Sequence, residues 1–251
     1  MKNSKSFIII CIGVLLFGCF SLGVSPGCVF AGEDEEISEL MGEYEEQNEI
    51  TQVADPLYWY NYAIFQFNDK LYAWFVEPAA NGYRHVVPEE IRSCVGNFFT
   101  NLFFPVRFVN NLLQGDIKGA GTEVKIFCIN TTLGGLGFAK VAQDEFNLQS
   151  MDEDFGQTLG KYHVGEGIYI VWPFLGPSTL RDSIGMAGDS FLYPLNYLES
   201  PEAVIGSKVL YSINSTSYRI GDYGQLKKAA IDPYTALKNG YIQQRQKKIQ
   251  E

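Results

Sequence analysis

The stretch GNFFTNLFFPVRFVNNLLQG, residues 96–115, is the part of the chain that most constrains the fold. Its five phenylalanines are interrupted by side-chain amides at positions 97, 101, 110, 111 and 114. The apolar run therefore stops short of the ~18 residues that a membrane-spanning helix needs. Pro105 removes a backbone donor and disfavours helical geometry at Phe104. The stretch is predicted to form a helix, a break and a second short helix.

Two interpretations of this helix pair remain open. In the first, the pair lies in the plane of a membrane interface, with one side on acyl chains and the other on water. In the second, it is a buried hairpin whose asparagines cap and pair inside the protein. Asn97 and Asn101 are four residues apart and share a helix face. Periodicity does not distinguish a core from a lipid-facing surface, so both interpretations stand.

The N-terminus predicts export. Lys2 and Lys5 precede an apolar run from Phe7 to Val24, which is the pattern of a secretory signal peptide covering residues 1–31. Cleavage after Ala31 fits ordinary signal peptidase. Alternatively, the lipobox-like residues 16–19 would leave a lipidated Cys19, although Phe17 is bulky for that motif. Either route takes the protein out of the cytoplasm.

Charge excludes some partners. Without Lys2 and Lys5, the 19 basic residues fall to 17 against 29 acidic ones, a net charge of −12. This balance argues against nucleic acid, whose binding requires neutralised phosphates. It also argues against docking by attraction to anionic lipid, so membrane affinity would be apolar. Residues 32–54 contain nine carboxylates between positions 33 and 50, and they are predicted to be a disordered acidic leader.

Residues 55–251 are predicted to form a single, mostly helical domain. Asp55 and Pro56 are expected to start an aromatic-rich helix over 57–76, which Glu77 and Pro78 would end. The other expected features are a helix from Pro88, a turn over 115–121, a helix over 122–130, a glycine-rich stop over 133–137, a helix after Pro177 with Ser178 as N-cap, and short helices from Phe191 to a basic C-terminal helical tail. Strand-like alternation is scarce, so the expected class is all-α.

No catalytic or metal pattern is evident. The segment 176–180 lacks the last glycine of a nucleophile elbow. His85 and His163 are the candidate neutral bases, and neither belongs to a recognisable nucleophile or metal pattern. Cys94 and Cys128 are read either as a disulfide or as buried thiols. The prediction is a non-enzyme without cofactor or metal.

A set of short motifs, in consistent order from about residue 55 to 240, resembles the MlaA/VacJ family. They are Asp55-Pro56, Phe67-Asn68, Glu77-Pro78-Ala79, Val95-Gly96-Asn97-Phe98, Asn101-Leu102, Leu113-Gln114-Gly115-Asp116, Ile129-Asn130-Thr131, Phe155-Gly156-Gln157-Thr158-Leu159-Gly160, Pro173-Phe174-Leu175-Gly176-Pro177-Ser178, Arg181-Asp182 and Asp232-Pro233-Tyr234. Each motif is weak alone, whereas their ordered set is specific.

The resemblance implies a ring-shaped monotopic bundle of amphipathic helices in the inner leaflet of a Gram-negative outer membrane. Such proteins are usually lipoproteins, associate with trimeric porins and have a central polar channel. They remove misplaced phospholipid from the outer leaflet and pass it to a soluble periplasmic carrier of the MlaC type. This maintains the lipid asymmetry of the outer membrane.

The candidate site follows from placing the motifs on this expected fold. Asn68, Asn97 and Asn101 are expected near the pore or its gating helices, because amides hydrate a passing phosphate without trapping it. Gly134 and Gly135 are expected to form a hinged lip over the pore. Gly176, Pro177, Arg181 and Asp182 are expected to support the loop that borders the pore. The alternatives are a porin-binding envelope adaptor without transfer activity, and a lipid-modifying enzyme.

Overall fold

The computed structural model describes residues 53–250. The chain divides into two compact units, residues 1–50 and 51–251, and the structure below is that of the second. The predicted signal peptide, Cys19 and all but the last two residues of the acidic leader lie outside the described residues.

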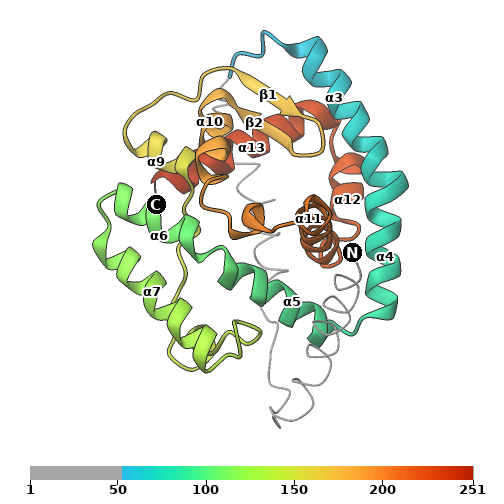
Figure 1. Ribbon diagram of the computed structural model, residues 1–251. Coiled ribbons are helices and arrows are strands. Elements are labelled where there is room, and N and C mark those ends of the chain that lie inside the picture. Colours follow the sequence, from blue (N-terminus) through green and yellow to red (C-terminus); the bar gives the residue numbers. More distant parts are fainter. Residues whose placement is uncertain (1–52, 251) are drawn as a thin grey trace. The chain divides into compact units, whose positions relative to one another are not determined.

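The elements follow one another as a series of helices with one small hairpin (Figure 1). In chain order they are α3 (Tyr58–Leu71), the π-helical η1 (Tyr72–Val76), α4 (Glu77–Val86), α5 (Glu89–Leu102), α6 (Phe104–Leu113), α7 (Ile117–Thr132), α8 (Val141–Asp144), α9 (Phe155–Lys161), β1 (Tyr169–Trp172), β2 (Gly176–Thr179), α10 (Leu180–Asp189), the 3-10 turn η2 (Pro194–Tyr197), α11 (Pro201–Thr216), α12 (Asp222–Ala229) and α13 (Pro233–Gln250).

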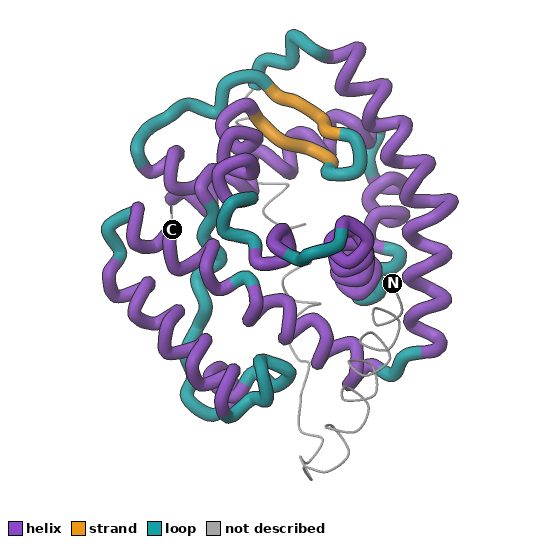
Figure 2. The backbone as a smooth tube through the Cα atoms, viewed as in Figure 1, coloured by secondary structure: helices purple, strands orange, loops and turns teal. Residues whose placement is uncertain are grey.

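Contacts between these elements close a circuit within the second unit (Figure 2). The hairpin β1–β2 packs on α3 and on α10, α10 packs on α9, α9 on α6, and α6 on α5. The circuit closes along the chain, where η1 and α4 follow α3 and residues 87–88 connect α4 to α5. Helix α11 lies inside the circuit and contacts α4, α5 and η2. The expected all-α, ring-shaped class is therefore confirmed, with the two-stranded sheet as a small addition.

The predicted break in residues 96–115 is present, one residue earlier than expected. Helix α5 ends at Leu102, Phe103 separates the two helices, and Phe104 is already the first residue of α6. Pro105 is accommodated because the first turn of a helix needs no backbone donor. The amides turn inward: Asn110 and Asn111 are fully buried, and Asn101 is nearly so. For these side chains, the internally paired hairpin is the interpretation that holds.

The expectation that Glu77 and Pro78 end the aromatic helix is wrong. The chain stays helical from Tyr58 to Val86 because η1 widens the turn before the proline. The Glu77 N–H bonds the Tyr72 carbonyl, five residues back, and Pro78 then falls in the first turn of α4, where its missing donor costs nothing.

Several predicted helix ends also shift. Asp55 does not cap α3; it accepts hydrogen bonds from Asn61 Nδ2 and Tyr234 Oη instead. The turn predicted over 115–121 is shorter, because Asp116 caps α7 by accepting from the Gly119 N–H at 2.9 Å. The N-cap of α10 is Thr179, the last residue of β2, rather than Ser178, because the Thr179 hydroxyl accepts from the Asp182 N–H at 3.2 Å.

The last third of the chain is less fragmented than predicted. Instead of short helices alone it contains α11, with 16 residues, and α13, with 18. The apolar segment 168–174 contains β1, which pairs antiparallel with β2 in a register that joins Tyr169 to Thr179. Asn61 fixes this hairpin to α3, because it donates to the Tyr169 carbonyl at 3.0 Å and accepts from the Val171 N–H at 2.8 Å.

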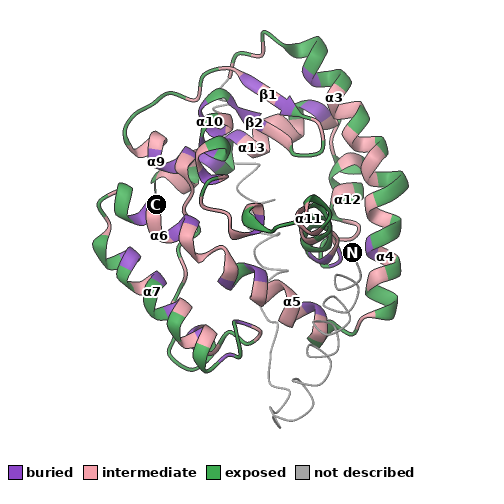
Figure 3. Cartoon of the chain, viewed as in Figure 1, coloured by how far each residue is buried: buried purple, intermediate pink, exposed green. Residues whose placement is uncertain are grey.

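The burial pattern is unusual for a globular domain (Figure 3). Among the described residues, 18 polar or charged residues are buried against 11 apolar ones, which reverses the ordinary preference. Large rings lie outside: Trp59 is 81% exposed, Trp74 69% and Phe75 65%. Buried hydrogen bonds and ion pairs are therefore a large part of the contacts inside the unit, and many large apolar side chains are exposed on its surface. None of its described helices has the length and apolarity to cross a bilayer.

Arg92 fixes α11 to α5. Its guanidinium is 4% exposed, and Nη1 donates to the Ser217 carbonyl at 3.2 Å and to Ser217 Oγ at 2.8 Å. Ser217 is the C-cap of α11, where the helix carries partial negative charge. No carboxylate in the described part of the chain pairs with Arg92, so the helix end provides its countercharge.

Arg92→Ala is expected to lower the free energy of unfolding by about 2 kcal/mol, because it removes charged hydrogen bonds from a buried helix end. Chemical denaturation followed by far-UV circular dichroism would measure the change. Arg84→Ala, at an exposed position on α4, serves as the control and should change it little. Equal effects from both substitutions would contradict the assignment.

Candidate functional site

A cavity of about 770 Å³ lies within the second unit, between α5, α6, α10, η2, α11 and α13. Its wall combines aromatic and charged groups. The rings of Phe103, Tyr193 and Tyr211 form one aromatic cluster, with centroid distances of 5.1 Å from Phe103 to Tyr193 and 5.2 Å from Phe103 to Tyr211. The lining carboxylates are Asp152, Glu153, Asp154, Asp182 and Asp189, and the lining cations are Arg107, Lys208, Arg245 and Lys248.

Arg245 of α13 organises one end of this wall. Its Nη1 and Nη2 bond the two carboxylate oxygens of Asp154 at 2.6 and 2.8 Å. Its Nε and Nη2 bond the two oxygens of Asp182 at 3.0 and 3.1 Å. Asp154 caps α9 and Asp182 lies in the first turn of α10, where helix dipoles favour negative charge. The Arg245 guanidinium thereby joins three helices.

The close approach of α9 and α10 at this point requires glycine. A Cβ on Gly185 would lie 2.4 Å from the Gly156 nitrogen, which is backbone and has little room to move. A Cβ on Gly156 would lie 2.7 Å from both Arg245 Nη2 and Asp182 Oδ1. Gly156 of the Phe155–Gly160 motif thus allows the two carboxylates to share one guanidinium.

The carboxylates of the site differ in pKa. Burial alone would raise the pKa of Asp154 and of Asp182, but the charge and hydrogen bonds of Arg245 outweigh it and hold both below the ordinary range. Burial raises the pKa of Asp189, and the nearby charge of Asp154 adds to that rise. The site therefore contains two firmly ionised carboxylates and one that is costly to ionise.

These shifts predict acid sensitivity. Groups with a lowered folded-state pKa stabilise the fold above the unfolded pKa of about 4, and this contribution is lost as pH falls through the folded value. The melting temperature should fall steeply below about pH 4, and Asp182→Asn should flatten that dependence. Asp144→Asn, at an exposed carboxylate, should leave the slope unchanged. Parallel pH profiles for wild type and D182N would contradict this.

Pro177 and Asp182 are the predicted site residues that line the cavity. Arg181, 4% exposed, donates from Nε to Asp182 Oδ1 at 3.0 Å, so the pair is buried structure as well as cavity wall. Asn68 acts on the adjacent hairpin: its Nδ2 donates to the Trp172 carbonyl and its Oδ1 accepts from the Phe174 N–H, both at 2.9 Å. Gly176 has φ +85° and ends the hairpin tip, whose Leu175 also lines the cavity.

The remaining predicted residues gather elsewhere, at the loop that follows α7. Asn97 donates to the Phe138 carbonyl at 3.2 Å, and Asn101 donates to Thr131 Oγ1 at 2.9 Å. A Cβ on Gly134 would lie 2.3 Å from the Ala139 carbonyl oxygen, so this loop is tightly packed at Gly134. Gly135, at φ +60°, has open space around it. A role of these residues in gating stays a prediction.

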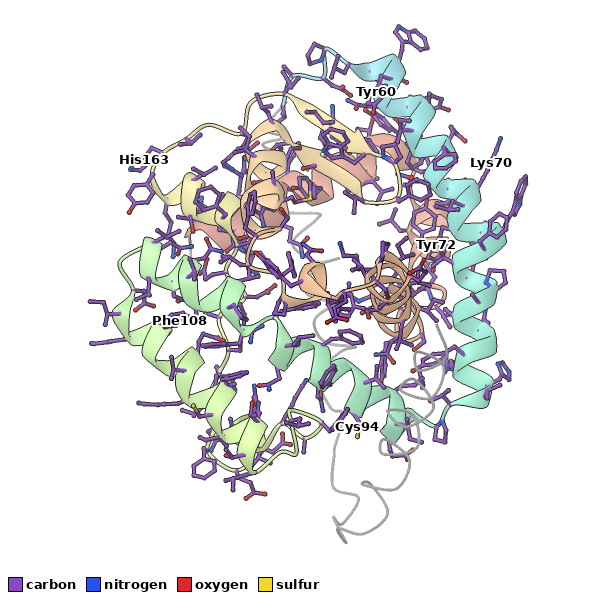
Figure 4. All side chains as sticks on the ribbon, in the orientation of Figure 1. Tyr60, Lys70, Tyr72, Cys94, Phe108 and His163 are labelled. Carbon is purple, nitrogen blue, oxygen red and sulfur yellow. The ribbon has the colours of Figure 1, made fainter. Side chains whose placement is uncertain are left out.

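Other predicted candidates have separate places. His85 Nδ1 lies 2.8 Å from the Asn81 carbonyl oxygen, and His163 projects from the loop after α9 (Figure 4). Cys94 is half-buried and Cys128 exposed, and no disulfide joins them. Within residues 53–250, no group of His, Cys, Asp and Glu side chains is arranged to hold a metal ion.

Sequence reasoning missed the central cation and the aromatic wall. Arg245 lies in the segment QQRQKK, where its pattern is that of a solvated basic tail, and Lys248 of the same tail pairs with Asp152 at 2.8 Å. Asp154 immediately precedes the Phe155–Gly160 motif, which is a signal that it caps a helix. No local sequence pattern indicates that Tyr193, Lys208 and Tyr211 belong to the cavity wall.

The fold and the cavity together define a class: a ring of helices that encloses a cavity lined by charged and aromatic groups, with many large apolar side chains exposed on its surface. The family model described as MlaA lipoprotein matches residues 53–248. The chain therefore belongs to the MlaA family, as its motifs predicted.

Named relatives support this assignment. The Intermembrane phospholipid transport system lipoprotein MlaA of Escherichia coli (strain K12) is 36% identical over 193 residues, which covers 76% of each chain. The protein of the same name from Haemophilus influenzae is 32% identical over 209 residues, covering 81% of this chain and 82% of that one. A solved structure reported as the structural basis for maintenance of bacterial outer membrane lipid asymmetry matches with a TM-score of 0.69 at 33% identity, and covers 78% of this chain and 99% of that one.

Proposed function

We propose that this protein is a non-catalytic phospholipid-transfer component of the outer membrane. It removes phospholipid that has strayed into the outer leaflet, conducts it through the cavity inside the helical ring and passes it to a soluble periplasmic carrier. The proposal agrees with the phospholipid transport named for the E. coli and H. influenzae relatives. Its consequence in the cell is the maintenance of lipid asymmetry.

The observation that carries the proposal is the placement of polar and apolar groups. A phospholipid has a charged head group and apolar acyl chains, so a protein that transfers it needs a hydrated path for the head group close to an apolar surface for the chains. The cavity provides charged and aromatic groups inside the ring. The exposed rings of Trp59, Trp74 and Phe75, which are not part of the cavity wall, provide apolar surface on α3 and η1. Tryptophan is enriched where apolar matter meets water in membranes.

The same proposal includes location and partners. The protein lies in the periplasmic leaflet of the outer membrane of a Gram-negative bacterium, held by apolar contact because its net charge, −12 without Lys2 and Lys5, repels anionic head groups. A trimeric porin holds the ring in the membrane, and an MlaC-like carrier receives the lipid. Movement of lipid needs no cofactor and no covalent step from this protein. Turnover of labelled phospholipid by the purified protein would instead favour a lipid-modifying enzyme.

Filling the cavity tests the proposal. Ser212→Trp places a large ring in the cavity from α11 and should abolish lipid transfer, so outer-leaflet phospholipid rises in cells to the level of a deletion strain. Ser215→Trp, on the same helix and also exposed but outside the cavity wall, is the matched control and should behave as wild type. Normal asymmetry in cells that carry a folded S212W protein at wild-type abundance would refute transport through this cavity and leave the adaptor role.

A further inference from the structure

The charges that line the cavity are almost all neutralised by a neighbour of opposite sign. Arg245 pairs with Asp154 and Asp182, Lys248 with Asp152, Glu153 with Lys161, and Arg107 with Glu123. Of the lining charges, Lys208 and Asp189 have no ion-pair partner among the described residues. One free cation and one free carboxylate therefore face the same cavity.

Asp189 is the last residue of α10 and is 4% exposed. Its Oδ1 accepts from Asn110 Nδ2 at 2.8 Å and its Oδ2 accepts from the Phe155 N–H at 3.0 Å. These bonds hold the carboxylate in place and leave it lone pairs, because an ionised carboxylate has about four acceptor sites. Burial raises the pKa of Asp189, so its ionised form is costly without a cation, and a ligand that brings a positive charge would stabilise that form.

Lys208 lies on α11, one turn before Tyr211, and its exposed side chain is part of the cavity wall. It is a compact ammonium with three donors, the kind of group that binds a phosphate as a point charge.

Aromatic rings line the same cavity as these two charges. Tyr211 packs on Phe103 and Phe103 packs on Tyr193. Tyr193 lies close enough to Asp189 for that carboxylate to raise its pKa, although burial is the larger cause, and together they bring the pKa to about 12. Tyr193 is thus a neutral phenol beside a carboxylate. Tyrosine faces and a carboxylate together suit an organic ammonium ion.

We propose that the cavity selects zwitterionic, amine-bearing phospholipid head groups of the phosphoethanolamine class: Lys208 binds the phosphate, and Asp189 with Tyr193 binds the ammonium. This specificity rests on the proposed transfer function. Both unpaired charges of the wall are then neutralised by one ligand, and the ligand's two charges are neutralised by the wall.

The remaining charge of the wall disfavours the alternative head groups. With the ion-pair partners of the lining residues included, carboxylates and cations balance, so the wall has no excess positive charge to attract a net negative ligand. A glycerol head group would place one negative charge in the cavity and leave the Asp189 carboxylate unpaired. Repulsion in a site of reduced dielectric is stronger than in water. Phosphoethanolamine avoids both costs.

The test is the lipid bound by the full-length protein after extraction and exchange in mixed micelles with equal amounts of dioleoyl phosphatidylethanolamine and dioleoyl phosphatidylglycerol. Bound lipid is quantified by mass spectrometry. The wild-type protein should be enriched in phosphatidylethanolamine roughly fivefold over the mixture. Asp189→Asn, which keeps the shape of the side chain, should bring the ratio close to one. Lys208→Gln should lower the total of both lipids several-fold, and Lys118→Gln, at an exposed position on α7, should change neither quantity.

The outcomes separate this inference from the function on which it rests. If the wild-type protein binds phospholipid in the proportions of the mixture, or prefers phosphatidylglycerol, the head-group assignment is overturned while transfer stands. If it binds neither lipid, the proposed function itself fails. The ratio of phosphatidylethanolamine to phosphatidylglycerol bound by the wild-type protein tests the head-group preference even if the Asp189→Asn variant does not fold. Retention of the fivefold preference by a folded D189N protein would also overturn the role of Asp189.

Discussion

Replacing Arg245 with alanine should destabilise the protein by about 3 kcal/mol, the largest single-residue effect that we expect. The substitution removes four hydrogen bonds and leaves the Asp154 and Asp182 carboxylates side by side without a cation. Loss of one partner from a buried ion pair typically costs about 3–5 kcal/mol, and we expect the lower end because the Asp154 side chain is 35% exposed. Equilibrium denaturation in detergent would measure the difference.

Two variants make this result specific to the shared guanidinium. Lys247→Ala, an exposed position two residues along α13, should be nearly neutral. Arg245→Lys should restore little, because an ammonium cannot bond two carboxylates in bidentate fashion. If Arg245→Lys were as stable as wild type, charge alone would explain the cluster and the helix-joining geometry would be irrelevant.

Replacing Trp59, Trp74 and Phe75 together with serine should abolish membrane association. Each ring is largely exposed, and its transfer into an apolar phase is worth roughly 2 kcal/mol, so the three together should lower partitioning on the order of 10⁴-fold. The measurement is flotation with vesicles of phosphatidylcholine, using protein that carries Cys19→Ala so that no acyl chain contributes.

The control for this experiment removes polar groups from the same helical segment. Lys70 projects outward from α3 (Figure 4), and Arg84 and His85 are exposed on α4. Their replacement by serine should leave flotation unchanged. Equal partitioning of the two triple variants would show that these rings do not contact lipid.

Much of the architecture could be predicted from local signals. The helix break near Pro105 follows from ring sterics that act within two residues, and the glycine-rich stop over 133–137 follows from the left-handed geometry that Gly135 and Gly137 adopt. The helix ends that were predicted at the wrong residues depend on contacts or on a helix geometry that the local sequence pattern does not show. Asp55 has the pattern of an N-cap, but Asn61 and Tyr234 provide its hydrogen bonds, and Pro78 has the pattern of a helix stop, but the π-helical turn η1 precedes it.

The candidate site was predictable only in part because its residues come from distant parts of the chain. Asp154, Asp182 and Arg245 are brought together by three helices, and no spacing in the sequence connects them. The amides of Asn97 and Asn101 have the residue type expected of a hydrated channel lining, yet they donate to the Phe138 carbonyl in the loop after α7 and to Thr131 at the end of α7. The residue types in the sequence predicted the chemistry of the interior. Which individual residues line the cavity could be seen only in the folded structure.

Photo-crosslinking in intact cells tests the central claim most directly. A benzophenone amino acid at Tyr211 lies in the cavity wall, and one at Trp74 lies on the exposed outer surface. If phospholipid moves through the ring, irradiation should attach phospholipid at Tyr211 as well as at Trp74, and Ser212→Trp should suppress the product at Tyr211 alone. Attachment at Trp74 with none at Tyr211 in a folded protein would mean that the protein touches the membrane without conducting lipid through its interior.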